Sequence, residues 1–225
     1  MVYFPEKSRQ FIDKGKVKVY STQLTYPESS YFLAFNKKIV QSGKTEIIND
    51  RRKNTYKIII LLNDKLELKL RQVNTEILDS SAVLLYIAKG ENRGTLKNVN
   101  PLGEAEFLEI TLKSVPPPLS LTQFVDYSPR KNLSQLLVSP WGIDNSILTG
   151  HPFWISKGRF EPNHPFSYKK YDSTNSLYLF LIHGEVTING WPLTYNDAIQ
   201  LSVNEDLKLE FIKPSELLII EMSKP

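Results

Sequence analysis

The sequence predicts an all-β protein made of two similar units, and three features of its hydrophobic pattern lead to this prediction. Leu66, Leu68 and Leu70 alternate with charged residues, as in a strand with one face in the core and one in water. Residues 57–62 form a short, mainly apolar run with β-branched side chains, which is typical of a strand buried on both faces. Few longer stretches have apolar residues at helical spacing, so helices of ordinary length are not expected.

Composition excludes several classes of protein. The chain has 225 residues, enough for one large or two small domains, with 41% hydrophobic and 23% charged residues. It has no apolar run long enough to cross a membrane, and its net charge of +4 falls well short of that of a dedicated nucleic-acid binder. We therefore expect no membrane or nucleic-acid partner. Because the chain has no cysteine, we expect no disulfides and no thiolate chemistry, and because it has no apolar N-terminal stretch, we expect a cytoplasmic location.

The predicted strands fall into two copies of one pattern. Residues 60–68 match residues 180–188, with the turn at Asn63 and Asp64 facing His183 and Gly184. In the same register, residues 77–83 match residues 193–199, each being a short apolar strand, a polar turn and a second strand. Additional strands are predicted at residues 82–87, 207–211 and 217–220.

Three consecutive prolines, at residues 116–118, lie between the two copies. Proline cannot donate a ladder hydrogen bond and favours an extended chain, so this segment marks the end of the first unit. We therefore predict an N-terminal domain with an N-terminal arm over residues 1–118, a connector over residues 119–139, and a C-terminal domain over residues 140–225.

The C-terminal pattern resembles a known family. Residues 180–199, FLIHGEVTINGWPLTYNDAI, are similar to a cupin barrel, and with residues 207–210 and 215–222 they follow the second barrel of the pirin-related bicupins. In the first half, residues 36–40, 56–68 and 107–110 follow the same family order, and residues 139–142 resemble the start of its second barrel. The resemblance implies two tandem cupin (jelly-roll) barrels joined by a proline-rich connector.

The resemblance also implies where a metal would bind. Pirin-type proteins hold iron in the first barrel through a His-x-His pair and a later His and Glu. The counterparts here fall at residues 50–52, which are Asp-Arg-Arg, and within residues 91–95, and no histidine precedes His151. A protonated arginine has no lone pair for a cation and repels it. We therefore expect no metal and no other cofactor in the first barrel.

The three histidines do not predict a metal site in the second barrel. Gly158 and His164 have the spacing of the start of the general cupin motif, but Phe166 stands at the second histidine position and residues 199–210 contain no histidine. One imidazole does not make a transition-metal site. We interpret His164 as a turn residue, His183 as a loop residue and His151 as part of the start of a strand, and we predict no catalytic residue.

Two other groups of residues have competing interpretations. The basic clusters at residues 37–38, 51–53 and 169–170 could contact phosphate, but solvated turns explain them better. The aromatic residues near the start of the second barrel could form a ligand-stacking wall, but packing in the core is the simpler explanation. They are Phe153, Trp154, Phe160, Tyr168 and Tyr171.

A pocket in the first barrel is the sharper hypothesis. If Asp50, Arg52, Tyr56 and Glu67 line its interior in place of imidazoles, the cavity is polar and charged, and it could hold a small organic anion. The alternative is that these residues pair with one another and fill a collapsed cavity.

Three functions follow from these expectations. The first is a pirin-like bicupin that has lost its metal site and binds another molecule, such as a protein partner, without catalysis. The second is a dioxygenase of the quercetin 2,3-dioxygenase type, which requires ligands that the sequence does not supply. The third is a small organic-anion-binding barrel. The sequence does not predict an oligomeric state.

Overall fold

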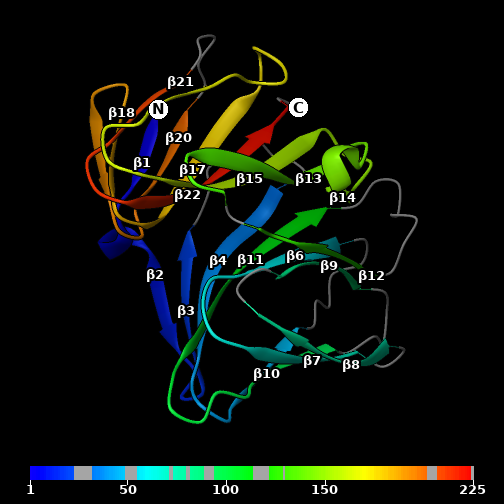
Figure 1. The fold of residues 1–225 in the computed structure, drawn as a ribbon. Coiled ribbons are helices and arrows are strands. Elements are labelled where there is room, and N and C mark those ends of the chain that lie inside the picture. Colours follow the sequence, from blue (N-terminus) through cyan, green and yellow to red (C-terminus); the bar gives the residue numbers. More distant parts are fainter. Residues whose placement is uncertain are drawn as a thin grey trace. The chain divides into compact units, whose positions relative to one another are not determined.

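The structure, a computed structural model, describes residues 1–22, 32–48, 55–70, 73–79, 82–88, 94–113, 122–128, 130–201 and 207–223. Within these ranges the regular structure consists of strands and two short 3₁₀ turns, η1 (Glu6–Ser8) and η2 (Ile143–Asn145) (Figure 1). No helix in the described part of the chain is long and apolar enough to cross a membrane. The prediction of an all-β protein is confirmed.

The chain divides into two compact units. The N-terminal unit is Arg9–Tyr127, and the C-terminal unit combines Met1–Ser8 with Ser128–Pro225. The predicted connector therefore does not stand apart. Within it, β12 (Thr122–Asp126) pairs with β9 of the N-terminal unit, and β13 (Leu133–Ser139) pairs with β15 of the C-terminal unit. Strand pairing draws both ends of this segment into the two larger sheets.

The N-terminal unit has two sheets. The larger has the order β12-β9-β6-β11-β4-β3-β2 and the smaller has the order β5-β10-β7-β8. Their other strands are β2 (Gln10–Asp13), β3 (Val17–Thr22), β4 (Phe32–Val40), β5 (Thr45–Ile48), β6 (Thr55–Leu61), β7 (Leu66–Leu70), β8 (Val73–Leu78), β9 (Ala82–Ala88), β10 (Gly94–Asn98) and β11 (Ala105–Lys113).

The C-terminal unit has the same two-sheet design. Its larger sheet has the order β1-β20-β17-β22-β15-β13-β14 and its smaller sheet the order β16-β21-β18-β19. Their strands besides β13 are β1 (Val2–Phe4), β14 (Ile147–Leu148), β15 (Phe153–Phe160), β16 (Pro165–Tyr168), β17 (Ser176–His183), β18 (Glu185–Ile188), β19 (Trp191–Thr194), β20 (Ala198–Leu201), β21 (Leu207–Phe211) and β22 (Ser215–Met222).

The internal repeat predicted from the sequence is confirmed. The run β9-β6-β11-β4 in the first larger sheet corresponds to β20-β17-β22-β15 in the second, and β5-β10-β7-β8 corresponds to β16-β21-β18-β19. The predicted overlay of residues 60–68 on residues 180–188 therefore places the turn between β6 and β7 over the turn between β17 and β18. The repeat was detectable because both copies alternate between apolar and polar residues in the same order.

The core of each unit lies between its two sheets. In the N-terminal unit, the cluster includes Ile59 and Phe107 from the larger sheet and Leu68 and Leu96 from the smaller one. The C-terminal unit repeats this arrangement, with Leu179 and Ile219 facing Val186 and Leu209 among its core residues. In both units, strands of the two sheets direct every second side chain into the core that the sheets share.

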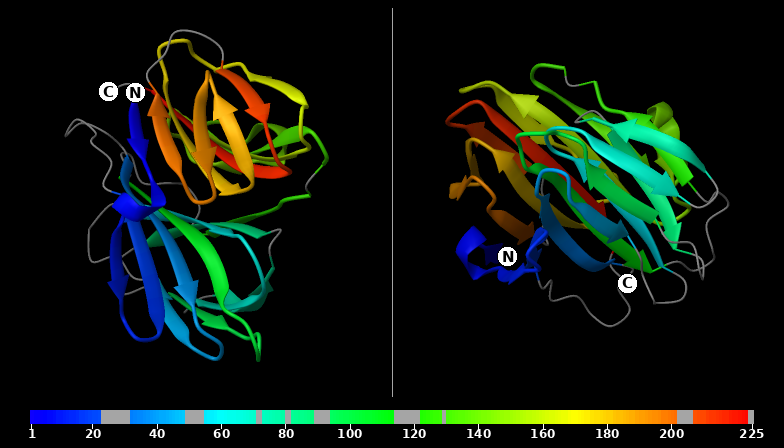
Figure 2. Two further views of the ribbon diagram at one scale, coloured as in Figure 1. Left: turned by 90° about the vertical axis from the view of Figure 1, so that its left-hand side faces the viewer. Right: turned by 90° about the horizontal axis from the view of Figure 1, so that it is seen from below.

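The N-terminal arm belongs to the C-terminal unit, whereas the sequence placed it in the N-terminal domain. Strand β1 pairs antiparallel with β20, and Figure 2 shows this blue strand beside the orange strands of that unit. The Tyr3 hydroxyl donates a hydrogen bond to Asp197 Oδ2 at 2.8 Å, and the Glu6 backbone N–H donates to Asp197 Oδ1 at 3.1 Å. Burial and the Asp197 carboxylate raise the pKa of Tyr3 to about 12. Strand pairing and one carboxylate therefore fix the arm in place.

Candidate functional site

The structure describes only part of the pocket predicted in the first barrel. Asp50 and Arg52 lie outside the described residues, and Tyr56 lies in β6 but its side chain is not described. Glu67 lies on β7 between the core residues Leu66 and Leu68, on the opposite face of the strand, and forms an ion pair with Lys69 at 3.0 Å. The pocket formed by these four residues stays a prediction.

A different set of charged side chains meets inside the N-terminal unit. On β4, Lys38 shares the inward face of the strand with the core residue Val40, two positions later. On β6, Lys57 shares its face with the core residue Ile59. On β11, Glu109 lies directly opposite Ile59 in the strand register. Three neighbouring strands therefore direct charged groups into the space between the two sheets.

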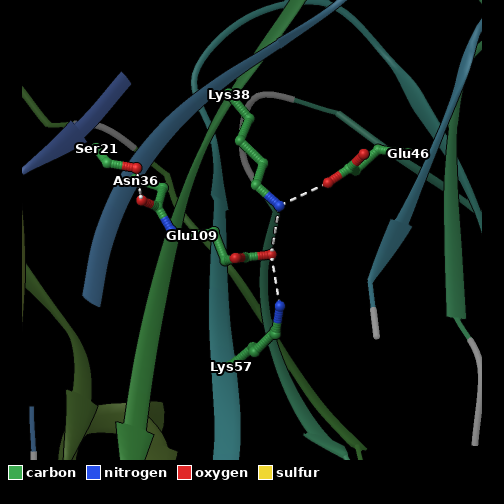
Figure 3. Close-up of polar contacts among 6 residues, drawn as sticks. All are labelled: Ser21, Asn36, Lys38, Glu46, Lys57 and Glu109. Atoms are coloured by element: carbon green, nitrogen blue, oxygen red, sulfur yellow. Dashed lines mark hydrogen bonds and ion pairs between the residues drawn. The ribbon is translucent and has the colours of Figure 1, made fainter. Parts of the chain in front are cut away.

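These groups form one connected ion network (Figure 3). Glu109 Oε2 lies 3.0 Å from Lys38 Nζ and 3.0 Å from Lys57 Nζ, so one carboxylate oxygen bridges two ammonium groups. Lys38 Nζ also lies 2.6 Å from Glu46 Oε1, which comes from β5 in the opposite sheet. The network therefore links the two sheets through the interior of the unit.

A second polar pair lies in the next cross-strand positions. Asn36 is directly opposite Glu109 on one side and Ser21 on the other. The Ser21 hydroxyl donates to Asn36 Oδ1 at 2.7 Å (Figure 3). Glu109, Asn36 and Ser21 therefore form a row of polar side chains in directly opposite positions on the three adjacent strands β11, β4 and β3.

Burial makes the charges in this network strongly interdependent. The Glu109 side chain is 3% exposed and the Lys38 side chain 7%. Burial alone would raise the pKa of Glu109, but Lys38 and Lys57 outweigh it, and the net pKa is lowered. Burial would likewise lower the pKa of Lys38, but Glu109 and Glu46 outweigh it, and the net pKa is raised. Glu109 and Lys38 therefore both stay charged, and each depends on the opposite charges around it for compensation.

The sequence interpretation of the cluster at residues 37–38 as a solvated turn was wrong. Both lysines lie within β4 and are buried. Lys37 pairs with Glu106 at 2.8 Å, and Lys38 is in the network described above. Both lysines are buried because successive side chains of β4 point to opposite faces of the sheet, and β11 provides a carboxylate on each face, Glu106 for Lys37 and Glu109 for Lys38.

The donor set in the N-terminal unit does not fit a redox metal. Residues 9–127 contain neither histidine nor cysteine, so imidazole and thiolate ligands are not available to it. The inward groups of the described part are carboxylates already paired with lysines, and a protonated ammonium has no lone pair to donate. Among the described residues of the whole chain, no three His, Cys, Asp or Glu side chains come together in a way that could hold a metal ion.

The C-terminal unit buries a different carboxylate. Glu221, on β22, is fully buried and accepts three hydrogen bonds. Its donors are the Tyr168 hydroxyl at 2.9 Å, the Asn175 side-chain amide at 2.6 Å and the backbone N–H of Asp172 at 3.1 Å. Burial and the Glu221 charge raise the pKa of Tyr168, so its hydroxyl remains a donor. This carboxylate is compensated by neutral donors rather than by lysines.

The aromatic residues near the start of the second barrel divide between the two interpretations. Phe160 is a core residue and stacks on Phe211 at a centroid distance of 4.4 Å. Trp154 instead stacks on the half-exposed Tyr171 at 4.9 Å and meets the exposed Trp141 edge-on at 5.9 Å. Most of the group is core, as expected, but one stack reaches the surface.

The three histidines all lie in the described part of the chain, and none belongs to a group of side chains that could hold a metal ion. His151 is buried, and burial lowers its pKa. His164 lies in a turn, where its backbone N–H donates to the Glu161 carbonyl at 3.3 Å. His183 is the exposed last residue of β17, and its ring lies 6.5 Å from that of Tyr195. All three belong to the C-terminal unit.

Residues 136–222 match the profile of a pirin family described as the quercetinase C-terminal cupin domain. Over 100% of the chain, the fold matches that of YhhW from Escherichia coli, with a TM-score of 0.83 and 14% identity over 98% of that chain. The whole chain has the fold of the pirin-related cupins. Its two units are the two barrels of a bicupin fold.

Other solved cupins are also similar to this chain. YhhW in complex with nickel(II) matches with a TM-score of 0.82 and 14% identity, covering 100% of this chain and 99% of that one. Quercetin 2,3-dioxygenase from Acinetobacter baumannii matches with a TM-score of 0.72 and 10% identity, covering 100% and 86% of the two chains. No curated protein sequence matches the chain. Identities this low show a shared fold and do not transfer an activity.

Proposed function

We propose that this pirin-related cupin has lost the metal site of its first barrel and acts by binding another molecule rather than by catalysis. The observation that carries the proposal is the bridge from Glu109 to Lys38 and Lys57 inside the N-terminal unit. Lys57 is the third residue of β6, close in the chain to residues 50–52, where the family resemblance places the first metal ligands. Positive charge is therefore already present on this side of the barrel interior.

Electrostatics supports the proposal. The two lysines and the two carboxylates, Glu46 and Glu109, balance one another, so the network is neutral as it stands. A divalent cation placed beside it would be repelled by two ammonium groups and would meet carboxylates that are already paired. A protein partner or a small ligand requires no such charge exchange.

Metal analysis of the purified protein tests the proposal. The protein and E. coli YhhW, which has been solved with nickel(II), would be expressed and purified in parallel and assayed for transition metals by mass spectrometry. YhhW serves as the matched positive control. We expect a molar equivalent of metal in YhhW and far less than one in this protein. A stoichiometric metal in this protein would overturn the proposal.

A dioxygenase is the second candidate, because the matched profile is that of a quercetinase domain and a quercetin 2,3-dioxygenase shares the fold. The test is aerobic incubation with quercetin after exposure to iron(II), nickel(II) or copper(II), with the Acinetobacter enzyme as control. We expect no metal-dependent loss of the quercetin absorbance with this protein. Turnover that requires one of these metals would establish the second candidate instead.

A further inference from the structure

A pocket of about 460 Å³ opens on the C-terminal unit. Its lining includes Lys131, Arg159, Glu161, His183 and Glu216. Its size lies within the range usual for small-molecule sites. Unlike most such sites, its walls carry several charged groups, so its ligand should be charged or strongly polar.

Strand register brings the polar residues of this pocket into one row. His183 at the end of β17 lies opposite Glu216 on β22, and Glu216 lies opposite Arg159 on β15. Lys131 forms an isolated bridge with Arg159 on the other side. The row is built on the ends of three paired strands of one sheet, so its side chains start from a rigid base.

The turn between β17 and β18 holds one end of this row close to β22. Gly184 has a φ of +98°, and a Cβ atom there would lie 2.4 Å from the Pro214 carbonyl oxygen and 2.3 Å from Ser215 Oγ. Only glycine allows this approach. Pro214 and Ser215 are themselves part of the pocket lining, so the glycine shapes the pocket next to His183.

Glu216 orients the arginine. Arg159 Nε donates to Glu216 Oε2 at 3.2 Å, while Lys157 Nζ lies 2.8 Å from Glu216 Oε1 behind it. A guanidinium held through Nε still presents the outer edge formed by its two Nη groups, and the donors on that edge do not face the carboxylate. The Arg159 side chain is 53% exposed, so these groups lie within reach of a ligand.

The charge balance favours an anion. The lining carries two cations, Lys131 and Arg159, and two carboxylates, Glu161 and Glu216, and His183 can add a further N–H donor. Lys157 lies outside the lining and pairs with Glu216, so it offsets the charge of that carboxylate from behind the pocket. Lys131 pairs with Glu161 at 3.2 Å, and its side chain is 70% exposed, so this pair can open at little cost. Glu216 stays committed to Lys157 and Arg159.

We propose that this pocket binds a small organic anion through carboxylate or phosphate oxygens, with Arg159 as the bidentate donor and Lys131 and His183 as supporting donors. Planar pairing of an arginine with an oxyanion gives both strength and orientation. The inference deepens the proposed binding function by naming a ligand class. It concerns the other unit from the metal question, so metal analysis and anion binding can fail separately.

Calorimetric titration of the full chain with citrate and with inorganic phosphate tests the inference, and the two probes distinguish a carboxylate from a phosphate ligand. We expect saturable binding of one of them, weakened about tenfold or more by Arg159→Gln, because a charge-assisted hydrogen bond is lost. Arg159→Lys should restore only part of the affinity, because it keeps the charge but not the planar donor pair.

Two more variants sharpen the test. Glu161→Gln should tighten binding, because it releases Lys131 and removes a negative charge from the pocket wall. Lys208→Gln, which removes an exposed lysine from β21 in the other sheet of the unit, is the matched control and should bind like the unaltered protein. Thermal melting would establish that each variant is folded. Failure of both probes to bind at millimolar concentration, or equal binding by a folded Arg159→Gln variant, would overturn the inference.

Discussion

Replacing Glu109 with glutamine should destabilise the protein strongly, because it leaves two buried ammonium groups without their shared counter-charge. At 3.0 Å and an effective dielectric constant of about 20, each lysine is attracted to Glu109 by about 5.5 kcal/mol before the cost of desolvation. After that cost, and with relaxation of the lysines, breaking a buried ion pair typically costs about 3–5 kcal/mol. This is a large part of the stability of a domain.

Urea unfolding followed by far-ultraviolet circular dichroism would measure the loss. Tryptophan fluorescence is a useful second signal, since no tryptophan precedes Trp141 and it therefore reports on the C-terminal unit. Lys18→Met is the matched control. It breaks an exposed pair with Glu104, whose side chain is 44% exposed, and should leave the midpoint nearly unchanged.

A double variant separates lost charge balance from lost packing. Lys57→Met with Glu109→Leu leaves Lys38 paired with Glu46 and removes the unbalanced charge, so it should be more stable than Glu109→Gln alone. A loss below about 1 kcal/mol in Glu109→Gln, or a double variant less stable than the single one, would refute the reasoning that the network is held together by charge.

Further predictions concern pH, the second buried carboxylate and the glycine turn. Because the pKa of Glu109 is lowered in the fold, its contribution to stability is present above the unfolded value of about 4.3 and is lost as the pH falls further, so the unaltered protein and Glu109→Gln should converge in acid unfolding curves. The raised pKa of Lys38 acts at the other end: its contribution is complete below about pH 10.4 and is lost as the pH rises further, and pH titration of unfolding would detect this. Tyr168→Phe removes a donor to the buried Glu221 and should cost about 1.5–3 kcal/mol in urea unfolding; an unchanged midpoint would show that this hydrogen bond adds nothing. Gly184→Ala, at a φ of +98° and against β22, should cost at least about 1–3 kcal/mol, and a melting temperature equal to that of the parent would contradict the close approach described for this turn.

The fold could be predicted because its signals are local. Alternation in residues 66–70 and 207–211 gives strands directly, and the repeated order of strands and turns gives two units. The placement of the N-terminal arm could not be predicted in this way. It depends on Tyr3 and Glu6 meeting Asp197 about 190 residues further along the chain, and no local pattern encodes such a contact.

The ion network was missed for a similar reason. The hydrogen bond between Lys38 and Glu109 joins residues 71 positions apart, and each residue alone looks like an ordinary polar residue of a surface strand. A signal was nevertheless present. Glu109 stands within the apolar run 107–112 at a position that period-two alternation directs inward, together with Phe107. A charged residue on the buried phase of a strand predicts a buried partner, although the sequence does not say which one.

The most direct test of the central claim is a crystal structure of the protein grown with excess nickel(II), with data collected at the nickel absorption edge. We predict continuous density from Glu109 to both lysines and no anomalous peak within bonding distance of side chains inside the N-terminal unit. An anomalous peak there, held by three or more side chains, with Lys38 or Lys57 displaced from Glu109, would contradict the claim that lysine ammonium groups stand in this barrel in place of a metal cation.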